Sequence, residues 1–115
     1  MRRGDVFFVD LDPYVGNAAT KTRPAVIVSN DAVNRTVERV GRGVVTLVPV
    51  TSHVDRIFRF QVLLPAGVAG LRTASKAQAE QVRSVDVARI GRRIGALGPD
   101  LLAKLDDALR IHLDL

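Results

Sequence analysis

One stretch of the chain decides the expected fold: RPAVIVSN, residues 23–30. Its apolar residues 25–28 follow one another without alternation, which indicates a strand covered on both faces. Pro24 opens the run and the polar pair Ser29-Asn30 ends it. The sequence therefore predicts a short buried strand with further layers on either side.

Three more segments outward from this run have strand patterns. Residues 5–11 place apolar side chains on both faces of an expected strand. Residues 44–48 are mostly β-branched, and we expect Pro49 to end that strand because proline cannot donate to a ladder. Residues 58–64 alternate apolar with mainly polar side chains, which predicts a half-buried strand.

The end of the chain predicts a helix. Pro99 suits the first helical position, and Asp100 complements the positive end of the helix dipole. A wide apolar stripe follows, made by Leu101, Leu102, Leu105, Leu109 and Leu113. This stripe packs on a sheet or on a partner, and the sequence leaves that choice open. Residues 32–40 stay ambiguous between a short helix and a loop.

Together these elements predict one domain over residues 1–115, of the α+β class but mostly β: a small curved sheet or barrel capped by a helix. The absence of cysteine excludes a disulfide framework, and two histidines are too few for a dedicated zinc or iron centre. No apolar run is long enough to span a bilayer, and the N-terminus has no signal-peptide pattern, so we expect a cytoplasmic protein.

The net charge points to a polyanionic partner. Seventeen Lys and Arg residues against twelve Asp and Glu residues give +5 at pH 7. Residues 99–115 hold two basic and four acidic side chains, so the basic excess lies in residues 1–98. A basic body suits a phosphate backbone, although solubility alone explains the same charge.

Polar residues that are capable of chemistry gather at three expected strand boundaries. They are Lys21 and Arg23, then Thr51, Ser52 and His53, and last Ser75, Lys76, Glu80 and Gln81. A guanidinium makes planar phosphate contacts and keeps its proton, and a hydroxyl donates to a phosphate oxygen or a developing oxyanion. If the boundaries converge, they form a site that stabilises negative charge on phosphorus. Otherwise these residues only cap turns.

Several segments together resemble the MazF/PemK/Kid family of endoribonuclease toxins from type II toxin–antitoxin systems. They stand in the family's order over essentially the whole chain: RGDVFFVDLDP at 3–13, TRPAVIVSN at 22–30, VPVTS at 48–52, Gly70-Leu71 with Ser75, EQVRSV at 80–85, and the leucine-rich helix. The resemblance implies an SH3-like (CcdB/PemK-like) barrel of about 5–7 antiparallel strands with a C-terminal helix. It also implies a strand at 77–85, where local propensity favours a helix.

The same resemblance implies partners and chemistry. The substrate would be single-stranded RNA, cleaved without a metal or other cofactor. The protein would be a homodimer, with an antitoxin whose acidic tail folds over the RNA site. Operator DNA would be bound only through the antitoxin complex, and no membrane would be involved.

Arg23 and Thr51 match the residues that the resemblance marks as catalytic. In the implied reaction a ribose 2′-hydroxyl attacks the adjacent phosphorus, giving a 2′,3′-cyclic phosphate and a 5′-hydroxyl. Arg23 would hold and neutralise the phosphorane, and Thr51 would share its charge through a hydroxyl or backbone N–H. A 2′-deoxy nucleotide at the cut site is therefore expected to block cleavage.

One position departs from the resemblance. Ala18 stands where many relatives carry Glu, so a carboxylate general base or base-reading group is missing. His53, two residues past Thr51, is a possible acid–base group in its place, because an imidazole titrates near neutral pH. Ser52 is a further possible catalytic hydroxyl.

Residues for RNA binding also follow from the resemblance. Asn17, Ser75 and Gln81 are expected to read the substrate. Candidates for phosphate contacts are Lys21, Arg56, Arg59 and Lys76, although for each cation taken singly a solvated surface position is the more common arrangement. Aromatic residues make up only 4% of the chain, so extensive base stacking is not expected, and Tyr14 is the one loop aromatic available.

Three other functions remain open at this stage. A gyrase poison of the same fold would bind a protein target and would not need Arg23 or Thr51. A nucleic-acid-binding module would bind RNA in a salt-sensitive way without cutting it. A purely structural dimer module would account for the helix and core but not for the polar strand ends.

Overall fold

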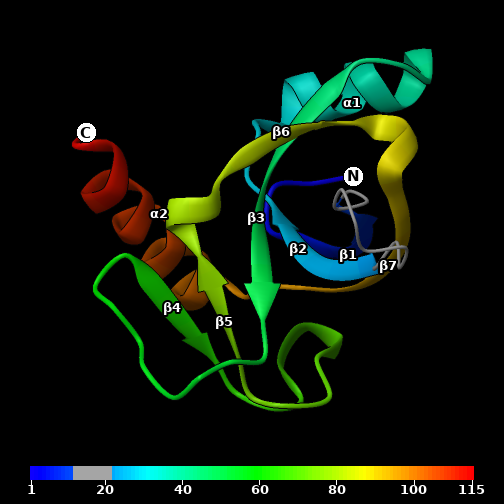
Figure 1. The fold of residues 1–115 in the computed structure, drawn as a ribbon. Helices are drawn as coiled ribbons and strands as arrows, with labels where there is room; N and C mark the ends of the chain where they lie inside the picture. The colour runs from blue at the N-terminus through cyan, green and yellow to red at the C-terminus, as the bar shows by residue number, and fades with distance from the viewer. Residues whose placement is uncertain (12–21) are drawn as a thin grey trace, which may run out of the picture.

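Seven strands form a curved antiparallel sheet in the computed structural model, which describes residues 1–11 and 22–115 (Figure 1). The strands are β1 (Asp5–Asp10), β2 (Thr22–Ile27), β3 (Val44–Thr51), β4 (Gln61–Leu64), β5 (Ser75–Gln78), β6 (Arg83–Asp86) and β7 (Ile90–Ala96). The helical elements are α1 (Asp31–Val40) and α2 (Pro99–Leu113), with 3-10 turns η1 (Val68–Gly70), η2 (Ala79–Gln81) and η3 (Val87–Arg89). The predicted class, mostly β with a C-terminal helix, is confirmed.

Strand β3 pairs with three other strands of the sheet. The strand order is β4-β5-β3-β2-β1-β7, and β6 also pairs with β3. One edge of β3 pairs with β2, and its other edge pairs with β6 over residues 44–47 and with β5 over residues 50–51. Within the described residues β4 and β7 end the order, so the sheet is strongly curved but does not close into a full barrel.

The expectation that Pro49 would end its strand is wrong, and the pairing explains why. Pro49 lies inside β3 opposite Ala25 of β2. The Val28 N–H donates to the Thr46 carbonyl at 2.9 Å, and hydrogen-bonded pairs alternate along an antiparallel ladder. The Ala25–Pro49 pair is therefore a non-hydrogen-bonded one, whose missing N–H would point to the other edge. On that edge residue 49 falls between the β6 and β5 pairings, so no ladder bond is lost.

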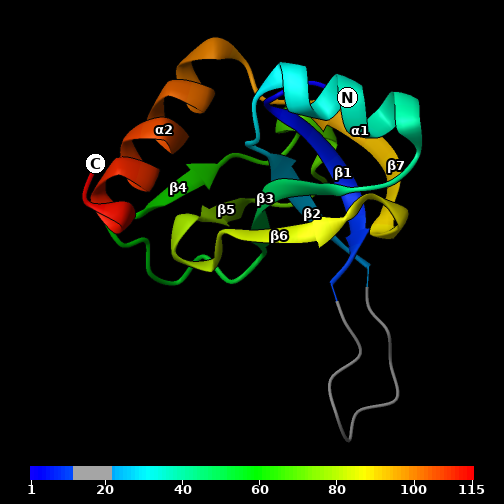
Figure 2. The same cartoon turned by 90° about the horizontal axis from the view of Figure 1, so that it is seen from above.

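Two hydrophobic clusters hold the helices on the sheet. The larger contains Val6, Val26 and Leu64 from the strands, with Leu105 and Leu109 from α2. The smaller packs Val37 of α1 against residues of β1, β2, β3 and β6. The two helices lie over separate parts of the sheet in Figure 2. The leucine stripe of α2 thus faces the sheet at Leu105, whereas Leu113 remains 48% exposed.

Capping makes the ambiguous segment 32–40 a helix. The Asn30 side chain accepts from the Val33 N–H at 2.9 Å, which satisfies a free donor of the first turn. At the other end Gly41 takes a left-handed conformation, and its N–H donates to the Val37 carbonyl at 2.8 Å. Asn34 is fully buried. Its side-chain oxygen accepts a hydrogen bond from the Ser29 hydroxyl, and its side-chain NH₂ donates to the Ser29 carbonyl.

Two other predicted strands are shorter than expected. The strand predicted at 58–64 begins only at Gln61, because the Gln61 N–H turns back to the Phe58 carbonyl at 2.9 Å. The strand implied at 77–85 is split into β5 and β6 by η2. That turn lets the chain move from one half of β3 to the other.

Candidate functional site

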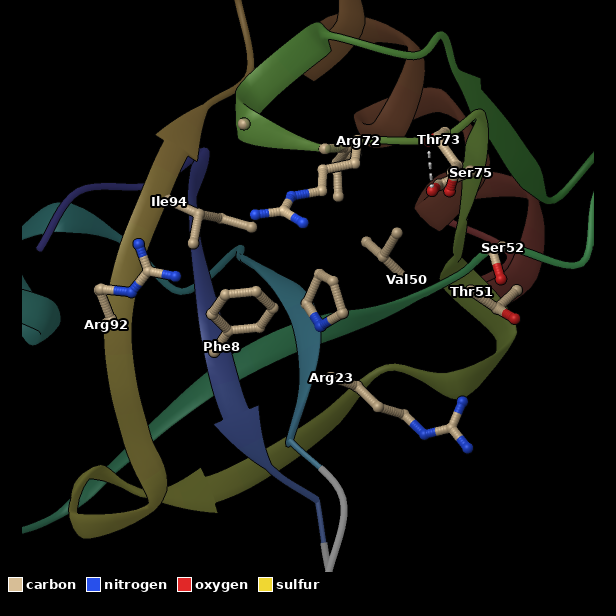
Figure 3. Close-up of a pocket in the computed structure, with 13 residues that line it drawn as sticks. Phe8, Arg23, Val50, Thr51, Ser52, Arg72, Thr73, Ser75, Arg92 and Ile94 are labelled. Atoms are coloured by element: carbon tan, nitrogen blue, oxygen red, sulfur yellow. Dashed lines mark hydrogen bonds between the residues drawn. The ribbon is translucent and has the colours of Figure 1, made fainter.

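A pocket of about 460 Å³ lies where the N-terminal end of β2 meets the C-terminal end of β3 (Figure 3). Its remaining walls come from β1, β7 and the segment between η1 and β5. The lining residues are Phe8, Arg23, Pro24, Val50, Thr51, Ser52, Gly70, Leu71, Arg72, Thr73, Ser75, Arg92 and Ile94. Among the described lining residues there are three guanidinium groups and no carboxylate, so this part of the pocket suits an anion.

Arg23 and Thr51, the two residues expected to be catalytic, line this pocket together. Arg23 is exposed, and the described residues offer it no hydrogen bond or ion pair. Thr51 is half-buried at the end of β3, where its Oγ1 accepts the His53 backbone N–H at 3.3 Å. That bond leaves the Thr51 hydroxyl proton free to donate to a ligand, and the Arg23 guanidinium is a second donor in the same pocket lining.

The opposite side of the pocket carries Arg72 and Arg92 (Figure 3). Arg92 extends from β7 with its guanidinium 5.3 Å from the centre of the Phe8 ring, a cation–π distance. Arg72 follows η1, three residues before β5. Val50 lies between the two arginine-bearing sides in the view of Figure 3.

Glycines bring the Arg72 segment close to β7. A Cβ at Gly70 would lie 2.0 Å from the Ile94 carbonyl oxygen, and one at Gly95 would lie 2.4 Å from the Ala69 backbone. Gly70 also has φ +78°, which side-chain-bearing residues rarely adopt. The backbones of η1 and β7 can therefore touch, and this contact sets Arg72 beside the strand that carries Arg92.

The hydroxyl candidates differ in what they can offer. Ser52 lines the pocket and is exposed. Ser75 also lines it but is 4% exposed, and its hydroxyl donates to the Thr73 carbonyl at 3.0 Å. Ser75 can therefore accept a bond from a ligand but has no free proton to give. His53 is exposed and does not line the pocket.

Four residues expected to bind RNA lie outside the pocket. Lys76 is only 8% exposed, and its ammonium donates to the Arg56 carbonyl at 2.7 Å, which does not match a phosphate contact. The Arg56 guanidinium sits 4.7 Å from the centre of the Phe58 ring. Arg59 lines a different hollow, between β4 and α2. Gln81 is exposed in η2.

Several expectations fall on residues 12–21, outside the described part of the chain. They concern Tyr14, Asn17, Ala18 and Lys21. Over the described ranges, 1–11 and 22–115, no three His, Asp or Glu side chains gather as metal ligands would.

Arg72, Arg92 and Phe8 are site residues that the sequence interpretation did not identify. The arginine pair 92–93 inside an otherwise apolar and glycine-rich stretch, residues 90–96, was the available signal. It does not say which arginine faces the pocket. Arg93 turns away and pairs with Asp5 at 3.3 Å, whereas Arg92 lines the cavity.

The fold and the pocket define a class: a small, mostly β protein with a cationic pocket suited to phosphate. The chain belongs to the family described as PemK-like, MazF-like toxins of type II toxin–antitoxin systems, whose model matches residues 2–113. The resemblance drawn from the sequence motifs is thereby confirmed.

Individual relatives agree with this family. The chain is 54% identical to "Endoribonuclease MazF9" of Mycobacterium tuberculosis over 115 residues, all of this chain and 98% of that protein. It is 30% identical to "Endoribonuclease EndoA" of Bacillus subtilis, over all of this chain and 96% of that protein. Among solved structures, a MazE–MazF complex from Deinococcus radiodurans is similar with a TM-score of 0.80 at 26% identity, covering 100% of this chain and 96% of that one. No helix in the described ranges has the length and apolarity needed to cross a membrane.

Proposed function

We propose that this toxin is a metal-independent endoribonuclease that cleaves single-stranded RNA at its Arg23–Thr51 pocket, giving a 2′,3′-cyclic phosphate and a 5′-hydroxyl. The observation that carries the proposal is that Arg23 and Thr51, far apart in sequence, line one cavity whose described lining residues include no carboxylate. Relatives named endoribonucleases, at 54% and 30% identity over the whole chain, support the same activity.

The proposed chemistry is charge stabilisation at phosphorus. The ribose 2′-oxygen forms a bond to the phosphorus, and the bond from phosphorus to the 5′-oxygen of the next nucleotide breaks. Arg23 binds the non-bridging oxygens, where negative charge accumulates, and the free Thr51 hydroxyl proton donates to the same group. Binding of one phosphate by both donors would fix the reacting group in position for the attack.

Proton transfer in this proposal runs through water. The 2′-hydroxyl must lose a proton, and the departing 5′-oxygen must gain one. A guanidinium keeps its proton, so Arg23 is not the base. The described pocket lining contains neither a carboxylate nor an imidazole. His53 is exposed outside that lining, and it contributes to the site through the backbone N–H that fixes Thr51.

The proposed partners follow from charge and from exposed apolar surface. An acidic antitoxin segment is attracted to the pocket that otherwise holds RNA, which suits cytoplasmic inhibition of the toxin. Operator DNA would be reached only through that complex. A homodimer would cover apolar side chains at the end of α2 and on β4, namely Leu63, Ile111, Leu113 and Leu115, each more than 40% exposed.

The test is incubation of the protein with a long single-stranded RNA in excess EDTA. We expect defined fragments whose 5′ ends carry a hydroxyl and whose 3′ ends carry a cyclic phosphate. An RNA that is bound but stays intact would instead indicate a binding module. Cleavage that needs an added divalent ion would contradict the metal-independent mechanism.

A further inference from the structure

The proposed reaction leaves two cations of the pocket unused. Arg72 and Arg92 line the same cavity as Arg23, and both side chains are exposed. Within the described ranges no carboxylate lies in ion-pair distance of either guanidinium. The adjacent Arg93 differs, because Asp5 neutralises it at 3.3 Å.

Three cations around one cavity, none paired with a carboxylate in residues 1–11 and 22–115, repel one another, and apolar walls strengthen that repulsion. An anion that enters the cavity lowers this repulsion between the guanidinium groups. One phosphate held by Arg23 and Thr51 leaves the opposite side of the pocket, with Arg72 and Arg92, without a counter-charge (Figure 3). This distribution points to a second negative group in the ligand.

The second cationic side is built into the fold. Arg92 rests on the Phe8 ring with 5.3 Å between its guanidinium carbon and the ring centre. Arg72 follows Gly70, whose backbone packs so closely on Ile94 that a Cβ there would lie 2.0 Å from the Ile94 carbonyl oxygen. Packing at Gly70 therefore positions the Arg72 segment, and the Phe8 ring orients the Arg92 side chain.

In the view of Figure 3 the apolar side chains of Phe8 and Val50 lie between the two cationic sides, and Pro24 also lines the pocket. The pocket thus presents a cationic side, an apolar floor and a second cationic side. An RNA chain repeats in the same order: a phosphate, then a ribose with its base, then the next phosphate.

We propose that Arg72 and Arg92 bind the backbone phosphate adjacent to the scissile one, so that one nucleoside lies across the apolar floor. They are binding and positioning residues, because the adjacent phosphate does not react. This inference rests on the proposed function for the identity of its ligand, but it can be tested without cleavage.

The probes are the four ribonucleoside 3′,5′-bisphosphates, which carry two phosphates on one nucleoside, compared with the matching 3′- and 5′-monophosphates. Binding to the full chain is measured by calorimetry at fixed salt. We expect at least one bisphosphate to bind roughly 10-fold more tightly than both of its monophosphates, the usual size of one charged hydrogen bond. In Arg72→Gln and Arg92→Gln this advantage should fall to about twofold or less.

Arg35→Gln is the matched control, because Arg35 is an exposed arginine of α1 outside the pocket and its loss changes the net charge equally. It should keep the full bisphosphate advantage. Arg92→Lys retains the positive charge, and it should keep part of the advantage even if Arg92→Gln fails to fold. Circular dichroism checks the fold of each variant.

Two results would overturn the inference: bisphosphates that bind the wild type no better than monophosphates, or an advantage that persists in the folded Arg72 and Arg92 variants. These results are separate from a failure of the proposed function. RNA left intact in EDTA together with a bisphosphate advantage would reject the nuclease and keep the two-phosphate site. Cleavage of RNA without a bisphosphate advantage would keep the nuclease and reject the two-phosphate site.

Discussion

Arg23 is the residue on which the proposed chemistry depends most. It lines the pocket and has no partner among the described residues, so its charge is available to the phosphorane. We expect Arg23→Ala to lower the cleavage rate by roughly 10²–10³, the usual effect of removing one transition-state donor. Arg35→Gln should cleave at the wild-type rate. Initial rates on one RNA, with folding checked by circular dichroism, measure both.

A substitution at His53 tests whether its backbone N–H or its imidazole contributes to cleavage. Its backbone N–H donates to Thr51 Oγ1 at 3.3 Å, and this group survives His53→Ala. We therefore expect His53→Ala to cleave within about twofold of the wild type from pH 5 to 9, because a lone exposed imidazole adds nothing to charge stabilisation. A 10-fold loss with an altered pH profile would instead identify the imidazole as the acid–base group.

At the scale of elements, the contact between η1 and β7 shapes the pocket. Gly70 and Gly67 both have a left-handed φ. A Cβ added at Gly67 would meet no atom within 4 Å, whereas one added at Gly70 would collide with the Ile94 carbonyl. Gly67→Ala is expected to cost about 1 kcal/mol, the penalty for left-handed backbone alone. Gly70→Ala should cost about 2 kcal/mol more, because the Ile94 carbonyl must move.

Urea denaturation of the two glycine variants gives both free energies of unfolding. The Gly70 variant should also lose RNA affinity, since the segment that carries Arg72 is displaced. Equal stability losses for the two variants would contradict the role assigned to the η1–β7 contact.

At the scale of the whole molecule, exposed apolar side chains of β4 and α2 predict self-association. Light scattering should give a particle of twice the 12.5 kDa of the chain. Ile111→Glu, at a position 44% exposed on α2, should yield the monomer, because a charge buried at an apolar interface is unfavourable. Val40→Glu, at a position 54% exposed on α1, is the matched control and should remain dimeric. A wild-type mass of one chain would reject the homodimer.

The sequence was most informative where local chemistry decides the structure. The buried strand around Val26 and the helix that begins at Pro99 follow from composition and end signals, and both are found. Pro49 was misjudged because its tolerance depends on which edge of β3 is unpaired, a property of the whole sheet.

The same division holds for the pocket. Arg23 and Thr51 were predicted from strand ends and from the resemblance, and the fold brings them to one cavity. Arg72 and Arg92 join it through the contact between η1 and β7, which no local pattern encodes. Lys76 was expected at the surface, but its pairing with the Arg56 carbonyl buries it.

The central claim is that Arg23 and Thr51 act on one scissile phosphodiester of RNA. The most direct measurement compares wild type and Arg23→Ala on a mapped substrate in EDTA, with and without a single 2′-deoxy nucleotide at the cut. The account predicts 5′-hydroxyl fragments from the wild type, loss of that cut with the 2′-deoxy substrate, and a rate roughly 10²–10³ lower for the variant. Undiminished cutting by Arg23→Ala, or cutting of the 2′-deoxy linkage, would contradict it.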